Sequence, residues 1–325
     1  MPKLTDAEIL SRLKDESGSA LGAHEGRLAD DIEKLNEYYH GKPYGNEVEG
    51  RSKFVTREVY ETVESIMPYM IKVFFSADQA VIFDPEDEDD VQAAVQETEY
   101  VNWVFYRDNP GFKIGYTWIK DGLLNKVGYV KLTREAPEPE VLHYENQTEE
   151  QLQMMLAEAD PNFEGDVQIE QADDGTYTVD ITELTGQDRT CITNIPPEEF
   201  RISDGDIDPR EARYVAHQAL RSISSIRAMG IDIDDDVHDG GDETTLSSIA
   251  NDRHYEENAY ARDALDLGSS REVLLREEYI RVDRNDDGME ELWKFLRVGD
   301  EILLEERVQE VPYYHWSPII VPHRH

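Results

Sequence analysis

The residue pattern best suited to chemistry is a short acidic segment in the last quarter of the chain. It places oxygen ligands two residues apart around a glycine, in the order Asp283, Asn285, Asp287, Gly288, Met289 and Glu291. Oxygen atoms at this spacing can converge on a hard cation, because the glycine lets the backbone turn sharply. The segment therefore predicts a Ca²⁺ site, to which Met289 would offer its carbonyl and Glu291 its carboxylate.

Two features of this segment depart from a helix–loop–helix calcium site. The twelfth position is Lys294, where such a site needs a bidentate glutamate, and the flanking residues alternate as strands do. An EF-hand is therefore excluded. Because Asp, Asn and Gly also favour hairpin turns without any metal, a plain turn and a cation loop both stay open as interpretations.

No other pattern indicates catalysis. The single cysteine, Cys191, lies in a predicted strand, and the chain contains neither a Gly-x-Ser-x-Gly elbow nor a Gly-x-x-x-x-Gly-Lys phosphate loop. A two-metal nuclease would need carboxylates around a pair of cations, but 72 acidic residues form clusters by chance. We therefore predict no enzyme, no catalytic residue and no cofactor besides the possible Ca²⁺. A calcium-dependent interaction module that uses the Asp283–Glu291 loop and a carboxylate metal nuclease are kept as alternatives.

The charge balance restricts the partners of the chain. With 32 Lys and Arg against 72 Asp and Glu, the formal net charge is -40 at pH 7. Proteins that grip duplex DNA use Lys and Arg to displace counterions from the phosphates, so this chain should repel DNA on average. The sequence also contains no apolar run long enough to span a membrane. We expect no membrane partner and assign no residue to DNA binding.

The hydrophobic periodicity predicts an α+β protein, with a helical N-terminal part followed by an antiparallel β-rich part. In residues 1–128, Thr5 and Glu8 form a capping box for a short helix that Ser17-Gly18-Ser19 should interrupt. Apolar residues at three- to four-residue spacing predict further helices at 21–39, 55–74, 91–105 and 112–123. The first 128 residues should therefore form a mainly helical segment.

The pattern changes to the two-residue period of strands in residues 129–325. Strands are predicted at 129–133, 141–144, 167–171, 176–184, 191–195 and 214–219, with a β-meander at 273–309. A short helix should cover 222–229, and the acidic stretch 231–243 has too little apolar surface to pack. The apolar end at Ile319-Ile320-Val321 predicts that the natural chain continues beyond residue 325.

The order of several short motifs resembles the portal proteins of P22-like podoviruses. The resemblance begins in the segment from Tyr38 to Val55, which includes Gly41-Lys42-Pro43-Tyr44-Gly45-Asn46-Glu47. It continues through Phe83-Asp84-Pro85, Asn109-Pro110-Gly111-Phe112, Pro196-Pro197-Glu198-Glu199-Phe200 and the Asp283–Glu291 segment. It therefore spans most of the chain, although no single motif is diagnostic.

This resemblance implies a structural subunit of the phage portal, with residues 1–325 forming mostly its peripheral wing. The family implies a ring of identical subunits, usually twelve, that forms the conduit for DNA at one capsid vertex during packaging and ejection. The implied partners are other copies of the chain, the terminase large subunit, head–tail adaptor proteins and the capsid or scaffold protein. DNA would pass through without specific binding. The implied locations are the virion and, during assembly, the host cytoplasm.

Overall fold

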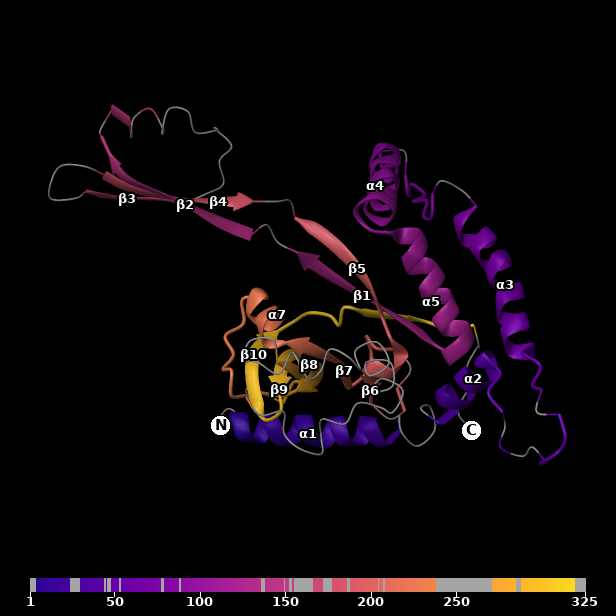
Figure 1. The fold of residues 1–325 in the computed structure, drawn as a ribbon. Coiled ribbons are helices and arrows are strands. Elements are labelled where there is room, and N and C mark those ends of the chain that lie inside the picture. The colour runs from indigo at the N-terminus through magenta and orange to yellow at the C-terminus, as the bar shows by residue number, and fades with distance from the viewer. Residues whose placement is uncertain are drawn as a thin grey trace. The chain divides into compact units, whose positions relative to one another are not determined.

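The computed structural model describes the chain except for residues 1–3, 24–29, 44, 46–47, 53, 77–78, 88, 136–137, 149, 152–153, 155–165, 172–176, 186–187, 204, 207, 238–270, 285–287 and 319–325. The chain forms two compact units: Met1–Leu132 with Ile192–His325, here called the first unit, and Thr133–Cys191, the second unit. Helices dominate the N-terminal part and antiparallel sheets the C-terminal part, which confirms the predicted α+β class (Figure 1).

The helices of the N-terminal part follow the predicted apolar periodicity. Their bounds are α2 (Asp30–His40), α3 (Glu58–Phe75), α4 (Val91–Trp103) and α5 (Gly111–Asn125), and a π-helical turn, η2 (Val104–Asp108), follows α4 directly. Pro68 lies inside α3, and the helix continues through it because buried or half-buried apolar side chains before and after the proline, from Val63 to Ile71, pack in one cluster with Ile119. Helix packing therefore outweighs the hydrogen bond that the proline cannot donate.

One carboxylate connects three of these helices. Glu64 of α3 accepts a hydrogen bond from the Tyr39 hydroxyl of α2 at 2.6 Å and pairs with Lys120 Nζ of α5 at 2.9 Å. The hydrogen bonds from Lys120 and Tyr39 hold the pKa of the Glu64 carboxyl below its ordinary value. The Lys120 ammonium also lies 5.5 Å from the centre of the Tyr39 ring. Glu64 thus holds α2 and α5 against α3.

A five-stranded antiparallel sheet forms the centre of the first unit. Its strand order is β10-β9-β8-β7-β6, with bounds β6 (Phe200–Ile202), β7 (Tyr214–Ser222), β8 (Glu272–Val282), β9 (Glu291–Val298) and β10 (Glu301–Arg307). Strands β8, β9 and β10 form the predicted meander. The short strand β6, which pairs with β7 through Phe200 and His217, was not predicted.

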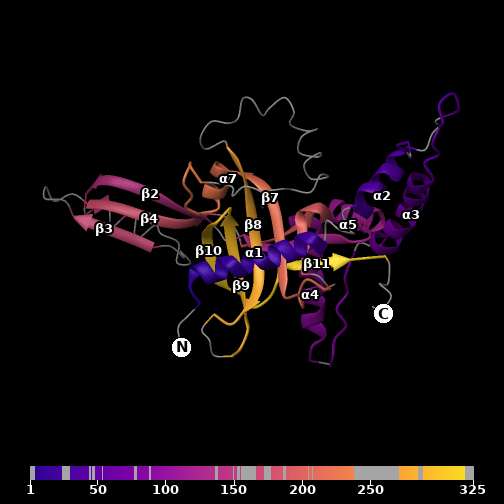
Figure 2. The ribbon, with the colours of Figure 1, turned by 90° about the horizontal axis from the view of Figure 1, so that it is seen from below.

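Helix α1 (Asp6–Ala23) covers one face of this sheet (Figure 2). The predicted interruption at Ser17-Gly18-Ser19 is wrong, because α1 continues through these residues. Ile9, Leu13 and Ala20 are buried against the sheet on both sides of the interruption, and Ser17 itself is buried. Packing therefore outweighs the low helix propensity of glycine and serine, which costs about 1 kcal/mol or less per residue.

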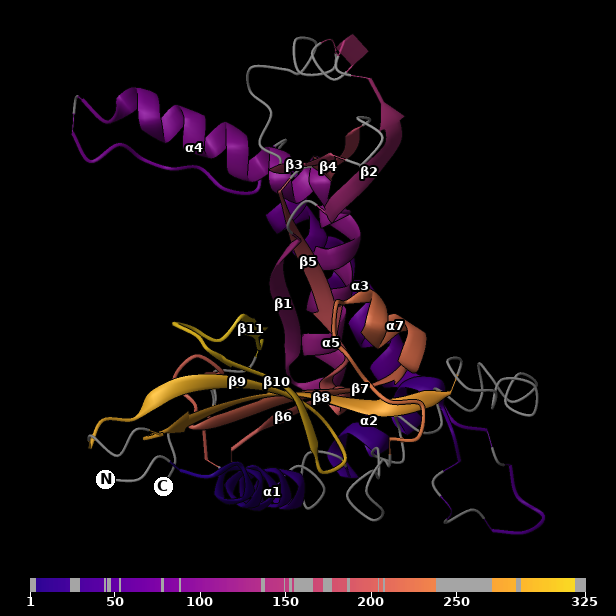
Figure 3. The same cartoon turned by 90° about the vertical axis from the view of Figure 1, so that its left-hand side faces the viewer.

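A second small sheet, with strand order β11-β1-β5, contributes side chains to the other face. Its strands are β1 (Gly128–Glu135), β5 (Arg189–Ile195) and β11 (Tyr313–Trp316), and Gly128 lies opposite Trp316 in the β1–β11 register. Tyr129 stacks on Phe200 with ring centres 4.0 Å apart, and Phe200 meets Tyr313 edge-on at 5.2 Å. Figure 3 shows α1 and β11 on opposite sides of the five-stranded sheet. The central sheet is therefore covered on both faces.

The start of the acidic stretch 231–243 is packed, contrary to the sequence prediction. Ile233 and Val237 are buried in one cluster with Ile223 and Ile226, which both belong to α7 (Ile223–Ala228). The Arg227 guanidinium donates to the Ile233 carbonyl at 2.6 Å, so it satisfies a backbone oxygen of this segment. Two apolar residues spaced four apart are thus enough to anchor it. Residues 238–243 of the predicted loop lie outside the described residues.

The second unit contains a three-stranded antiparallel sheet in the order β2-β4-β3. Its strands are β2 (Glu138–Gln147), β3 (Asp166–Gln171) and β4 (Tyr177–Thr185). Gln171 lies opposite Tyr177, which confirms the predicted hairpin between the last two strands. Near the ends of this unit, the Arg134 Nε donates to Asp188 at 2.7 Å.

Candidate functional site

The predicted cation loop connects β8 to β9. Asp283 directly follows β8, and its Oδ2 accepts a hydrogen bond from the Gly288 N–H at 2.7 Å. Gly288 has a φ of +86°, a backbone conformation that residues with a Cβ rarely adopt. Asn285 and Asp287 lie outside the described residues. The structure thus shows how the loop closes on Asp283, a geometry that needs no metal.

The other two predicted ligands lie after the glycine. Met289 is exposed, and Glu291, the first residue of β9, pairs with Arg307 of β10 at 3.0 Å. Arg281, Arg307 and Glu290 line the hollow beside Glu291, so the carboxylate that a cation would use already has an arginine partner. Among the described residues, no group of three His, Cys, Asp or Glu side chains is placed to hold a metal. The Ca²⁺ site stays a prediction.

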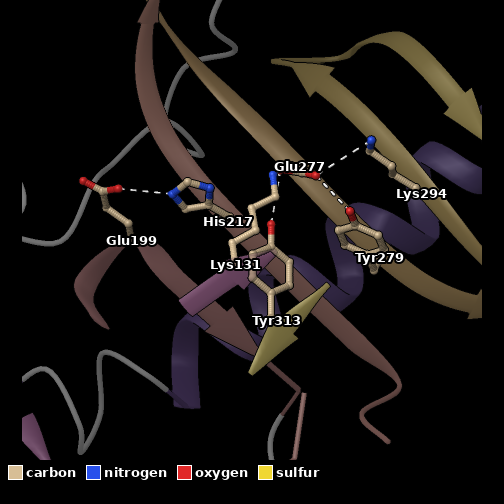
Figure 4. A network of polar contacts seen from close by, with 7 residues as sticks. All are labelled: Lys131, Glu199, His217, Glu277, Tyr279, Lys294 and Tyr313. Carbon is tan, nitrogen blue, oxygen red and sulfur yellow. Dashed lines mark hydrogen bonds and ion pairs between the residues drawn. The ribbon is translucent and has the colours of Figure 1, made fainter. Parts of the chain in front are cut away.

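The centre of the sheet holds a buried polar network that the sequence analysis missed (Figure 4). Glu277 of β8 forms an ion pair with Lys131 of β1, accepts hydrogen bonds from the hydroxyls of Tyr279 at 2.8 Å and Tyr313 at 3.2 Å, and has Lys294 of β9 at 3.9 Å. These partners come from four strands. One carboxylate therefore joins the meander to the β1–β11 pair.

The electrostatics of this network follow from burial and neighbouring charge. Burial by itself would raise the pKa of the Glu277 carboxyl, but the charge and hydrogen bond of Lys131, the Tyr279 hydroxyl and the Lys294 charge together lower it. Burial, with the Glu277 charge beside them, raises the pKa of both tyrosine hydroxyls. Glu277 is thus ionised at neutral pH and the tyrosines are neutral donors. Such a group stabilises the arrangement of strands.

A histidine–carboxylate pair lies beside this network. His217 Nε2 of β7 is 3.2 Å from Glu199 Oε2, and both side chains are buried. The His217 ring also meets the Tyr313 ring edge-on, with centres 6.4 Å apart. Glu199 belongs to the 3₁₀ turn η3 (Pro197–Glu199), so this pair fixes the turn that precedes β6.

The face of the sheet that packs on α1 holds a second buried polar group. Glu278 of β8 forms a two-point ion pair with Arg297 of β9, at 2.8 and 3.0 Å, and accepts the Tyr214 hydroxyl at 2.7 Å. Arg297 also donates to the Gly299 carbonyl at 2.6 Å. A signal for both networks exists in the sequence: Arg276, Glu277 and Glu278 are three consecutive charges inside an alternating strand, so charges must face both sides of the sheet.

An apolar pocket of about 370 Å³ lies between the helices and the small sheet of the first unit. Phe75 of α3, Trp118 of α5 and Trp316 of β11 are among its lining residues, and none of these residues carries a charge. Cys191, the residue that could act as a nucleophile, lies in β5 as predicted and is half-buried. The pocket therefore offers mainly apolar packing, and Tyr314 is the lining residue with a hydroxyl group.

The model of a family described as the phage SU10 portal protein matches residues 9–325 of the chain. No curated protein is similar enough to match. Among the described residues, no helix combines the length and the apolar character that crossing a membrane requires. The match covers both units and all of the elements described above except the start of α1.

Proposed function

The chain belongs to the phage SU10 portal protein family, and from this we propose that it is the subunit of a ring that conducts DNA through one capsid vertex. The expectation of a phage portal protein is confirmed, and with it a structural role in a bacteriophage particle. The single observation that carries the proposal is the length of the family match, residues 9–325.

The proposed ring has twelve copies of the chain and serves both genome packaging and genome ejection. Its further proposed partners are the terminase large subunit during packaging, head–tail adaptor proteins after it, and the capsid or scaffold protein around the vertex. Assembly would take place in the host cytoplasm. In this role the chain transforms no substrate, which agrees with buried polar groups in the first unit that bond to one another across strands.

The charge of the chain supports a conduit that DNA passes without sticking. A net charge of -40 repels the phosphate backbone, and a protein that released few counterions would bind duplex DNA weakly at any salt concentration. A protein that reads DNA sequence or processes DNA would need more basic than acidic residues on its DNA-binding surface.

Negative-stain microscopy with mass photometry of the purified chain tests ring formation. We expect closed rings whose mass corresponds to twelve copies. A chain that stays monomeric at every concentration would contradict the proposal.

Retention of duplex DNA tests the second part of the proposal. We expect no retention in a gel-shift assay at moderate salt. Tight binding that weakens steeply as salt is added would show that the protein grips phosphates, and this would overturn the repulsive conduit.

A further inference from the structure

Exposed apolar side chains gather in the helical part of the chain. In the part of the chain that the structure describes, 22 large apolar side chains are exposed, and 16 of them lie between Tyr38 and Phe112. The other six lie in residues 129–325, where three buried clusters form the core around the five-stranded sheet. A concentration of this kind marks a surface that another protein covers.

Residues 79–103, here called the arm, present much of this surface. An extended segment, 79–83, runs beside α4, as Figure 3 shows. Asn102 of α4 holds the backbone of this segment: its Oδ1 accepts the Ala80 N–H at 2.6 Å, and its Nδ2 donates to the Val81 carbonyl at 2.8 Å. Thr98 adds a bond from the Phe83 N–H at 2.9 Å. Buried polar side chains therefore fix the arm internally.

While Asn102 and Thr98 hold the backbone of the arm, its apolar side chains stay exposed to solvent. The exposed members are Val81, Ile82, Phe83, Val91, Val95, Tyr100 and Trp103. Ile82 is 68% exposed although its backbone neighbours are hydrogen-bonded to Asn102 and Thr98. A surface that is already ordered loses little conformational entropy on binding, so its apolar area favours association.

A different exposed apolar face lies on α3. Ile66, Tyr69 and Val73 recur at helical spacing, and Tyr69 and Val73 are each 73% exposed. Lys72 is exposed next to Val73, and the exposed start of α5 carries Lys113. We call Ile66, Tyr69, Val73 and Lys72 the α3 face. It is apolar with a positive charge at its side.

The two surfaces carry opposite charge. The arm contains eight acidic residues and no basic residue, including six acids between Asp84 and Asp90. The segments that flank the arm in the chain, 42–78 and 104–131, contain ten basic and eight acidic residues, in a chain with 72 acids and 32 bases. Two copies of such a chain repel each other overall, so a favourable contact needs this local complementarity.

We propose that the arm of one subunit docks on the α3 face of a second copy of this chain. Both surfaces are exposed within one chain, so they are not covered by each other there. Two different surfaces that fit each other make a head-to-tail contact, which closes into a ring when its rotation allows. The inference rests on the proposed ring function and names the surfaces that would form the ring contact.

Two charge substitutions test the contact from both sides. Ile82→Asp in the arm and Val73→Asp on the α3 face should each abolish rings in mass photometry, because an aspartate would be buried in the contact. Met229→Asp is the matched control, since Met229 is an exposed apolar residue of the β-rich part at 57% exposure. All three sites are exposed, so circular dichroism and the melting temperature should stay near those of the unsubstituted chain.

Photo-cross-linking identifies the partner surface directly. Ile82 is replaced by photoreactive p-benzoylphenylalanine, and the protein is assembled with an isotope-labelled copy before illumination. Cross-links between the two copies should map to α3, residues 58–75. Rings that survive both aspartate substitutions, or cross-links that map elsewhere, overturn the docking while the ring proposal stands. If the unsubstituted chain forms no rings, both the docking and the ring are overturned.

Discussion

Glu278 and Arg297 form an ion pair in which both side chains are completely shielded from solvent, between neighbouring strands at the centre of the sheet. Two hydrogen bonds join the carboxylate to the guanidinium, and Tyr214 and the Gly299 carbonyl engage the remaining positions. Taking two charges out of water is costly, so such a pair stabilises a fold only while it stays complete. Removing either partner of this fully hydrogen-bonded pair should therefore destabilise the fold strongly.

Arg297→Met should therefore lower the free energy of unfolding by about 3–5 kcal/mol, because it leaves the Glu278 carboxylate buried without its partner. Urea unfolding followed by circular dichroism measures the loss. The control is Arg307→Met, which removes an ion pair whose arginine is 66% exposed and should cost about 1 kcal/mol or less. Equal losses in the two variants would contradict this account of the buried pair.

Substituting alanine for two helical glycines should change the stability of the fold in opposite directions. A Cβ at Gly115 of α5 would lie 2.1 Å from the Phe75 ring of α3, so Gly115→Ala should destabilise the fold by about 1–3 kcal/mol through overpacking. Gly18 of α1 has no atom within 4 Å of the same position. Gly18→Ala should stabilise the fold by about 1 kcal/mol through higher helix propensity. Thermal unfolding of both variants measures the signs, and a stabilised Gly115→Ala protein would refute the close helix approach.

The Glu277 network predicts a loss of stability in acid. The pKa of the folded-state carboxyl lies below its ordinary value of 4.5, so its contribution is fully present above that pH and is lost as the pH falls through the folded pKa. Glu277→Gln should be less stable than the unsubstituted chain near neutral pH and should lose less stability on acidification below pH 4.5. Urea unfolding across this range measures the difference. Parallel pH profiles for the two proteins would remove Glu277 as a contributor.

Calcium should leave the stability of the chain unchanged if the Asp283 loop is a plain turn. Gly288 already donates to Asp283, and Arg307 pairs with Glu291, so we expect equal melting temperatures in Ca²⁺ and in EDTA. Asp283→Ala should cost about 1 kcal/mol in both conditions through the lost hydrogen bond. A melting temperature that rises with Ca²⁺ in the unsubstituted chain, but not in Asp283→Ala, would instead establish the cation site.

Local patterns in the sequence were sufficient for most elements of the fold. The capping box of α1 is present, with the Thr5 N–H donating to Glu8 at 2.8 Å, and the periods of three to four and of two residues located α3, α5, β8 and β9. These features depend on neighbours within a few residues, so the residue order is enough to predict them. The family was also recognisable from ordered motifs along the chain, and the match to residues 9–325 confirms a phage portal protein.

Only the tertiary structure decided the contacts between residues that lie far apart in the sequence. Strand β11 pairs with β1 across some 180 residues, α1 continues through Ser17-Gly18-Ser19 because the sheet holds it, and Glu277 gathers partners from four strands. The exposed arm also follows from such a contact, since Asn102 reaches back to Val81. The free energy of these contacts comes from burial, and burial depends on which elements meet in space, so no local pattern contains it.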